Sequence, residues 1–152
     1  MGALEFNPEA PYIVGVDLGG TTTTAGIVTK DGKVVRTHQR PTGAERGPEF
    51  VIQNLAEAVE QVLAEGGVDK SKVVGVGMGI PGHILSEQGV CVFSPNFVGW
   101  RNVKVTDPIE DRLGLKVTIM NDVNTAALGE WWFGAGKGAD SMVMLTLGTG
   151  IG

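Results

Sequence analysis

The sequence is poor in several features that mark particular classes of protein. Cys91 is the single cysteine, so no disulfide can form within the chain. Residues 1–10 carry two glutamates and no long apolar core, so we expect neither a secretory signal nor a membrane anchor there. No run of about 18 apolar residues occurs, which argues against a transmembrane helix. Together these absences favour the reducing environment of the cytoplasm.

Positive charge is also scarce. Lysine and arginine number 12 against 17 aspartates and glutamates, which gives a formal net charge of −5. No basic run that could follow a nucleic-acid backbone is present, so we expect no nucleic-acid partner. Any anionic ligand would therefore have to be held mainly by backbone amides and a bound cation.

Glycine, in contrast, is abundant, with 24 residues in 152, roughly twice the usual share of about 7%. The glycines cluster at residues 19–20, 75–82, 134–138 and 148–152. Such clusters indicate backbone that turns sharply or lies against a ligand. The hydrophobic share of 42% and the charged share of 19% are typical of a globular protein.

Apolar runs and turn residues predict an alternation of strands and helices. We expect helices over residues 48–65, from Asp107 to Gly114 with Asp107 as N-cap, and over 122–133 with Asp122 as N-cap. The strand after the first helix should run parallel to an earlier strand, since a crossover precedes it. The fold class is therefore α/β. The predicted strands cover residues 12–17, 23–29, 33–38, 73–80, 89–93, 117–120 and 141–147.

The first segment with chemical meaning is residues 17–22 (DLGGTT). A strand ends in a carboxylate, two glycines permit a tight turn whose amides can point at an anion, and threonine hydroxyls add donors. Asp17 suits a hydrated Mg²⁺, which keeps most of its waters and takes one or two carboxylates. We interpret the segment as a phosphate-binding loop, with a hairpin turn and a solvated aspartate as the alternative.

Two other glycine segments invite readings that their context rejects. Residues 77–82 match G-x-G-x-x-G, but a dinucleotide fingerprint must open a helix, and residues 83–93 have no helical period. A strand end that brings bare backbone at Gly82 close to a small polar ligand fits better, with a plain turn as the alternative. Residues 134–138 lack the first glycine and the final Ser/Thr of a P-loop, so we interpret them as a helix stop.

The segment at Asn121 and Asp122 lies between an apolar strand and a helix. An aspartate there is favoured by the helix dipole, as any ordinary N-cap would be. Asn121, which can donate and accept, suits adjacent sugar hydroxyls. The loop 94–100 has a polar tip at Asn96 and aromatics that either stack on a sugar or fill a core. His83 is a candidate sugar contact, although a single loop histidine is more often solvated.

Set in order, these segments resemble the ROK (repressor, ORF, kinase) family of the hexokinase/actin-like superfamily. Any one motif is unspecific, but five in the right order from Tyr12 onward are specific. They are residues 17–21 (first phosphate motif), 79–82 (sugar-loop glycine), 94–100 (loop over the sugar), 121–127 with Glu130 (catalytic strand-to-helix segment) and 147–152 (start of the second phosphate motif).

The resemblance implies a ribonuclease H-like (actin/hexokinase-type) domain with a mixed five-stranded sheet flanked by helices, and the start of a second similar domain. We expect a leader over residues 1–11, the first domain over 12–120 and the second from 121 to 152. The implied activity is ATP-dependent phosphorylation of a hexose, glucose first, with Asp122 as general base. Gly82, Asn96 and Asn121 would bind the sugar, and Mg²⁺ would bind Asp17 through water. The residues that would face the phosphates are Asp17, Gly19, Gly20, Thr21, Thr22, Gly148, Thr149 and Gly150.

Family members continue well past Gly152, with the rest of the sugar site, a zinc motif and the adenosine pocket. We therefore expect the chain as given to lack full activity, any structural zinc to lie in the missing C-terminal part, and the full-length protein to be a homodimer or tetramer. About eleven residues precede Tyr12, too few for the helix-turn-helix of the family's repressors. A non-catalytic sugar sensor, an ATPase acting on a protein, kinases for mannose, fructose or an N-acetylated hexose, and polyphosphate as donor remain open.

Overall fold

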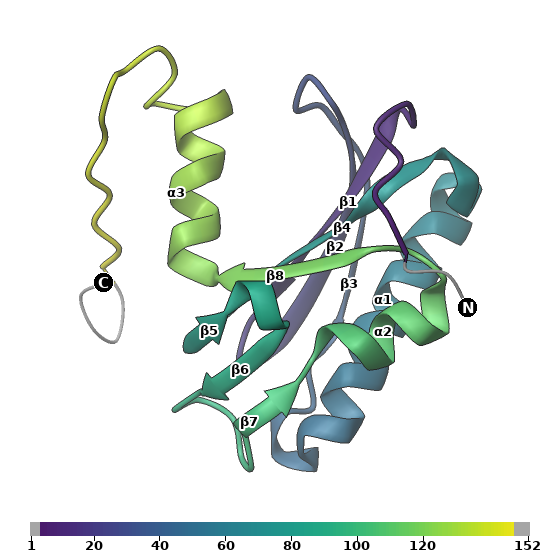
Figure 1. Ribbon diagram of the computed structural model, residues 1–152, viewed down its shortest axis with the longest axis vertical. Helices are drawn as coiled ribbons and strands as arrows, with labels where there is room; N and C mark the ends of the chain where they lie inside the picture. The colour runs from purple at the N-terminus through teal and green to yellow at the C-terminus, as the bar shows by residue number, and fades with distance from the viewer. Residues whose placement is uncertain (1–3, 148–152) are drawn as a thin grey trace.

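A computed structural model describes residues 4–147 of the chain (Figure 1). The α-helices are α1 (Pro48–Gly66), α2 (Thr106–Leu113) and α3 (Asp122–Phe133). Short 3₁₀ turns lie at residues 44–46, 70–72 and 86–88. The strands are β1 (Tyr12–Leu18), β2 (Thr22–Thr29), β3 (Val34–Pro41), β4 (Val73–Ile80), β5 (His83–Leu85), β6 (Val90–Phe93), β7 (Arg101–Lys104) and β8 (Val117–Asn121).

The main sheet has five strands in the order β3-β2-β1-β4-β8. β1, β2 and β3 form an antiparallel meander, and Gly32, with φ of +86°, turns the chain between β2 and β3. β4 and β8 run parallel to β1, because α1 and then α2 return the chain to the same starting edge. The mixed five-stranded sheet flanked by helices confirms the predicted α/β class.

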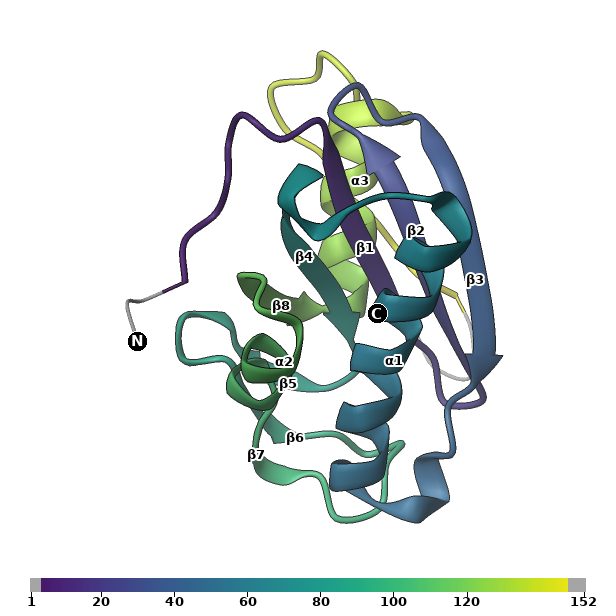
Figure 2. The same cartoon turned by 90° about the vertical axis from the view of Figure 1, so that its right-hand side faces the viewer.

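Helices cover both faces of this sheet. α1 and α2 lie on one face and α3 lies on the other (Figures 1 and 2). Side chains alternate between the faces along a strand, so β1 buries Val14, Val16 and Leu18 on the α1 side. The same alternation places Asp17, with Ile13 and Gly15, on the side of α3. The direction of Asp17 thus follows from the burial pattern of its own strand.

A second, three-stranded antiparallel sheet, β5-β6-β7, was only partly predicted. β5 and β7 are three and four residues long and carry too few positions to show an alternation. The loop 94–100 joins β6 to β7 and is closed by a hydrogen bond from Ser94 N to the Trp100 carbonyl at 3.2 Å. Trp100 is 1% exposed and its ring lies 5.2 Å from that of Phe97. These aromatics therefore anchor the loop in the core.

Two helix starts differ from the prediction. α2 begins at Thr106, and Asp107 is not its N-cap but accepts a hydrogen bond from Thr106 Oγ1 at 3.0 Å. α3 is capped by Asn121 rather than Asp122, since the Asn121 side chain accepts from the first free amides of the helix. At α3 a neighbouring polar side chain takes the capping position, whereas the N-cap residue of α2 is Val105 and no side chain caps that helix. A rule based on residue type alone decides neither case.

The strand predicted at residues 141–147 is wrong over residues 141–146, which adopt no regular structure. Val143 and Leu145 are 89% and 71% exposed. A strand needs a neighbour that pairs its amides and carbonyls, and none lies beside this segment in the described part of the chain. No helix among residues 4–147 is long and apolar enough to cross a bilayer. The predicted division into domains near residue 120 stays a prediction.

Candidate active site

Three parallel strands end at one edge of the main sheet. In register, Asp17 of β1 pairs with Gly79 of β4, and Gly79 in turn pairs with Met120 of β8. Ligands of open α/β sheets bind outside the carboxyl ends of the strands. The topology therefore gathers the predicted phosphate loop after β1, the glycine turn after β4 and the polar pair after β8 at this edge.

Asn121 is the polar centre of the site. Its Nδ2 donates to the carbonyl of Gly82 at 3.1 Å and to Asp122 Oδ1 at 3.0 Å. Its Oδ1 accepts from the amides of Val123 at 3.0 Å and Asn124 at 3.2 Å. Both amide hydrogens and the oxygen are thus in use, so a bond from Asn121 to a ligand hydroxyl requires one of these bonds to be exchanged.

Asp122 presents its two carboxylate oxygens differently. Oδ1 accepts from Asn121 Nδ2 and from the Val123 amide, both at 3.0 Å. Oδ2 has no hydrogen-bond partner among residues 4–147. Gly79 packs against the start of α3: a Cβ at this position would lie 3.4 Å from the Asp122 Cα and 3.5 Å from the Thr125 side chain. One oxygen of this carboxylate is therefore fixed, and the other is available to accept a hydrogen bond from a ligand.

Asp17 lies within the electrostatic reach of Asp122. Partial burial, and then the negative charge of Asp122, raise the pKa of the Asp17 carboxyl above its ordinary value. Neither carboxylate forms an ion pair with a lysine or arginine in the described range of the chain. The pair therefore leaves negative charge uncompensated at this edge, a donor set of the kind that a hydrated divalent cation takes.

The predicted phosphate loop has a tight turn, but glycine is needed there for space rather than for a left-handed conformation. Gly19 N donates to the Thr22 carbonyl at 3.1 Å, and a Cβ on Gly19 would come within 2.7 Å of that oxygen. A Cβ on Gly20 would meet nothing within 4 Å. The amides of Gly20 and Thr21 have no acceptor within residues 4–147, so the loop retains free donors for an anion. Gly148, Thr149 and Gly150 lie outside the described residues.

Gly82 fills a position that admits no side chain. Its φ is +118°, and a Cβ would lie 2.3 Å from the carbonyl oxygen of Phe93. His83 and Asn96, the other candidate sugar contacts, are exposed on the small sheet and its loop. Neither side chain forms a hydrogen bond with Asn121 or Asp122 in the described part of the chain.

Two polar residues behind the phosphate loop carried no motif and were missed. Thr42 is fully buried and Asn54 is 2% exposed. Thr42 Oγ1 donates to the carbonyl of Gly19 at 2.7 Å. The one available signal was Asn54 itself, which lies on the apolar face of the predicted helix over 48–65. A buried amide needs hydrogen-bond partners, so its position indicated a polar contact beneath that helix.

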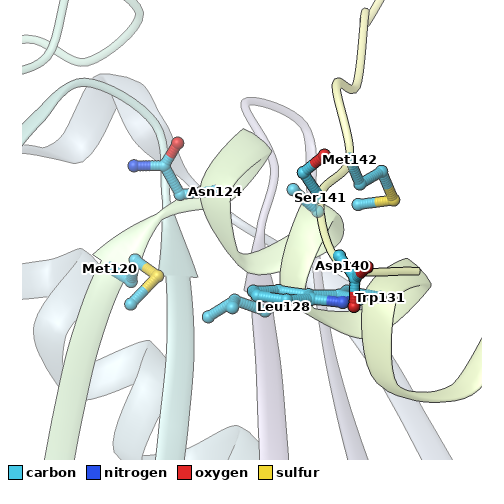
Figure 3. A pocket seen from close by; sticks show the side chains of 8 residues that line it. Met120, Asn124, Leu128, Trp131, Asp140, Ser141 and Met142 are labelled. Atoms are coloured by element: carbon cyan, nitrogen blue, oxygen red, sulfur yellow. The ribbon is translucent and has the colours of Figure 1, made fainter. Parts of the chain in front are cut away.

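A hollow of about 500 Å³ lies beside the site, between α3 and the segment that follows it (Figure 3). Trp131 Nε1 donates to the Ala139 carbonyl at 3.0 Å and ties the two together. None of Asp17, Gly82 and Asp122 lines this hollow, so it is separate from the polar edge described above. Its lining consists of Met120, Asn124, Ala127, Leu128, Trp131, Asp140, Ser141 and Met142.

Comparison with known proteins gives a consistent result. A family model described as ROK family matches residues 13–152. A glucokinase of Thermotoga maritima is 49% identical over 140 residues, which are 92% of this chain and 43% of that protein. The structure of a ROK family glucokinase from Streptomyces griseus in complex with glucose and AMPPNP aligns with a TM-score of 0.82 and 37% identity, over 93% of this chain and 43% of that one.

Regulators match as well. A xylose repressor of Bacillus subtilis is 28% identical over 149 residues, 98% of this chain and 38% of the repressor. The chain thus spans well under half the length of each of these three proteins.

Proposed function

Because the chain belongs to the ROK family, we propose that the natural protein carrying it is a sugar kinase, which transfers the γ-phosphoryl group of ATP to the 6-hydroxyl of a hexose, glucose first. The observation that carries the proposal is the asymmetry of Asp122, whose Oδ1 is held by two donors while Oδ2 is free. The likeness to glucokinases, one of them bound to glucose and AMPPNP, supports the same reaction.

In the proposed step, the sugar hydroxyl donates to Asp122 Oδ2. Its oxygen forms a bond to the γ-phosphorus as the bond from that phosphorus to the β,γ-bridging oxygen breaks, and the hydroxyl proton passes to Oδ2. Asn121 keeps the carboxylate in place through its bond to Oδ1, and ties it to the Gly82 turn. Such transfers gain most from positioning and electrostatics, which a fixed carboxylate supplies.

The phosphates would meet free backbone donors rather than basic side chains. The amides of Gly20 and Thr21 have no acceptor in the described part of the protein, and these donors face an anion without losing an internal bond. Asp17 would hold Mg²⁺ through a water molecule. A magnesium ion bound with ATP neutralises charge on the phosphates, and its charge would also offset the repulsion between Asp17 and Asp122.

Coupled ADP release by the natural protein over a panel of hexoses tests the proposal. For Asp122→Asn we expect kcat with glucose to fall by about 10²–10⁴, the usual contribution of a general base, with the dissociation constant for glucose within a few-fold of wild type. Asp111→Asn, an exposed aspartate on α2, is the matched control and should turn over normally. Unchanged turnover in Asp122→Asn would mean that the base is misplaced.

The same panel separates the alternatives. Glucose binding without ADP release would favour a sugar sensor, the reading that the likeness to a xylose repressor keeps open. A preference for mannose, fructose or an N-acetylated hexose, or turnover with polyphosphate in place of ATP, would change the substrate but not the role of Asp122. The expectation that the 152-residue chain alone lacks full activity stays a prediction, and tight binding of both glucose and ATP to it would contradict that expectation.

A further inference from the structure

Thr42, directly after β3, binds the phosphate loop from behind. Its Oγ1 donates to the carbonyl of Gly19 at 2.7 Å, and its backbone amide donates to the carbonyl of Thr21 at 2.8 Å. Thr23 Oγ1 lies 3.0 Å from Thr42 Oγ1. Because the single hydroxyl hydrogen of Thr42 is used on Gly19, Thr23 is the donor in that pair. All these contacts are internal, since Thr23 and Thr42 are fully buried.

These bonds set the direction of a free donor. The carbonyl of Gly19 and the amide of Gly20 belong to one planar trans peptide unit, in which C=O and N–H point in opposite directions. Thr42 holds the carbonyl toward the protein, so the amide of Gly20 points away from it. That amide has no acceptor within residues 4–147, and the space beside the Gly20 Cα is open. The buried hydroxyl of Thr42 thus sets the direction in which the Gly20 amide points.

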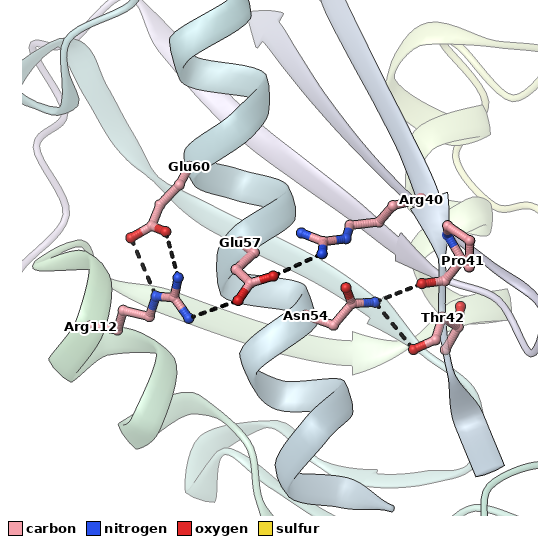
Figure 4. A network of polar contacts seen from close by, with 7 residues as sticks. All are labelled: Arg40, Pro41, Thr42, Asn54, Glu57, Glu60 and Arg112. Carbon is pink, nitrogen blue, oxygen red and sulfur yellow. Dashed lines mark hydrogen bonds and ion pairs between the residues drawn. The ribbon is translucent and has the colours of Figure 1, made fainter. Parts of the chain in front are cut away.

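Thr42 is itself held by helix α1. Asn54 donates from Nδ2 to the carbonyls of Pro41 at 2.9 Å and Thr42 at 3.1 Å (Figure 4). Next to these hydrogen bonds of Asn54, the carboxylate of Glu57 in α1 forms an ion pair with Arg40 at 2.8 Å. The end of β3 is therefore fixed to a rigid helix on the face of the sheet opposite α3, and the phosphate loop is fixed to the end of β3.

We propose that Thr42, oriented by Asn54, is a positioning residue for nucleotide binding, which aims the Gly20 amide at a phosphate of ATP. The inference rests on the proposed function, because it takes the loop over residues 19–22 to be the phosphate loop. A buried threonine that only stabilised the fold would affect sugar and nucleotide binding alike. A residue that aims one amide affects the nucleotide alone.

The test uses calorimetric binding of AMPPNP and, separately, of glucose to the natural protein. We expect Thr42→Val, which keeps the shape but removes the hydroxyl, to weaken AMPPNP binding about tenfold, the loss expected for one hydrogen bond to a charged group. Glucose binding should stay within about twofold, and Thr42→Ser, which restores the hydroxyl, should bind AMPPNP like wild type. Thr106→Val removes another buried hydroxyl, at the start of α2, and should leave AMPPNP binding unchanged.

Hydrogen exchange on the wild-type protein gives a second measurement that needs no variant. Without nucleotide, the Thr42 amide should be protected and the Gly20 amide should exchange fast, and AMPPNP should slow Gly20. The proposal is overturned if Thr42→Val binds AMPPNP normally, if it loses glucose and AMPPNP equally, or if AMPPNP leaves the exchange of Gly20 unchanged. Normal AMPPNP binding with no turnover on any hexose would refute the proposed function while leaving this test intact, and absence of AMPPNP binding would overturn both.

Discussion

Gly82 offers a sharp test of how the site is built, through the substitution Gly82→Ala. The residue lies between β4 and β5 with φ of +118°, a conformation outside the range that side chains adopt. An added Cβ would lie 2.3 Å from the Phe93 carbonyl oxygen and 2.9 Å from the Ser94 Cα. Both obstacles are backbone atoms at the end of β6, so no side chain can rotate out of the way.

The expected cost is the sum of two effects. Holding a non-glycine residue at such a φ costs roughly 1–3 kcal/mol. Relieving an overlap of about 1 Å with backbone costs roughly another 1–3 kcal/mol, as overpacked interiors do. We therefore expect Gly82→Ala to lower the free energy of unfolding by roughly 2–6 kcal/mol. The shift needed at Ser94 would also move the loop 94–100, so glucose affinity should fall.

Urea denaturation of the natural protein, followed by near-UV circular dichroism, measures the first effect, and calorimetry with glucose measures the second. Gly26→Ala in β2 is the matched control, because its Cβ would make ordinary contacts at 3.6 and 3.7 Å and its φ is not positive. It should be neutral or slightly stabilising. A loss below about 1 kcal/mol for Gly82→Ala, with unchanged glucose affinity, would refute the argument.

Two further predictions concern the polar edge. Burial and the charge of Asp122 raise the pKa of Asp17 in the folded protein. Wild type therefore loses stability relative to Asp17→Asn as the pH rises from the pKa of an unfolded aspartate through the raised pKa of the folded state. Asp17→Asn should then be more stable than wild type at neutral pH by at most about 1 kcal/mol, after allowance for solvent exposure, but its turnover should be impaired. If the two proteins showed the same dependence of stability on pH, the prediction would be contradicted. Asn121→Ala should lower the free energy of unfolding by about 1–2 kcal/mol, because the cap of α3 is lost. Asn121→Asp keeps the capping oxygen but not the Nδ2 donors, so it should recover much of that stability without recovering kcat. Recovery of both stability and kcat would contradict the role given to Nδ2.

Much of the fold could be predicted from the sequence because its determinants are local. The meander from β1 to β3 follows from apolar runs interrupted by Asp31 and Gly32. Helix α1 follows from apolar residues at three- and four-residue spacing between Pro48 and Gly67. The strand at 73–80 could be assigned as parallel because a helix precedes it. Topology then brings Asp17 and Asp122 to one edge without further information.

Some local signals misled because a second residue competed for the same role. Asn121 and Asp122 are both good N-caps, and the bonds of Asn121 to the amides of Val123 and Asn124 settle which one caps α3. The alternation of residues 141–147 favours a strand, but a strand forms only beside a partner, and residues 141–146 have none in the described part of the chain. Short strands such as β5 and β7 are set by the register of neighbours and not by their own pattern.

The sequence by itself therefore determined the order of strands and helices and the segments that reach the site, since periodicity and turn chemistry act between near neighbours. The tertiary structure alone decided how those segments are aimed. Thr42 reaches Gly19 across 23 positions and Asn54 reaches Thr42 across 12, and Asn121 reaches Gly82 across 39. Hydrogen bonds between residues so far apart leave no periodic trace in the chain, because they depend on how the helices pack on the sheet.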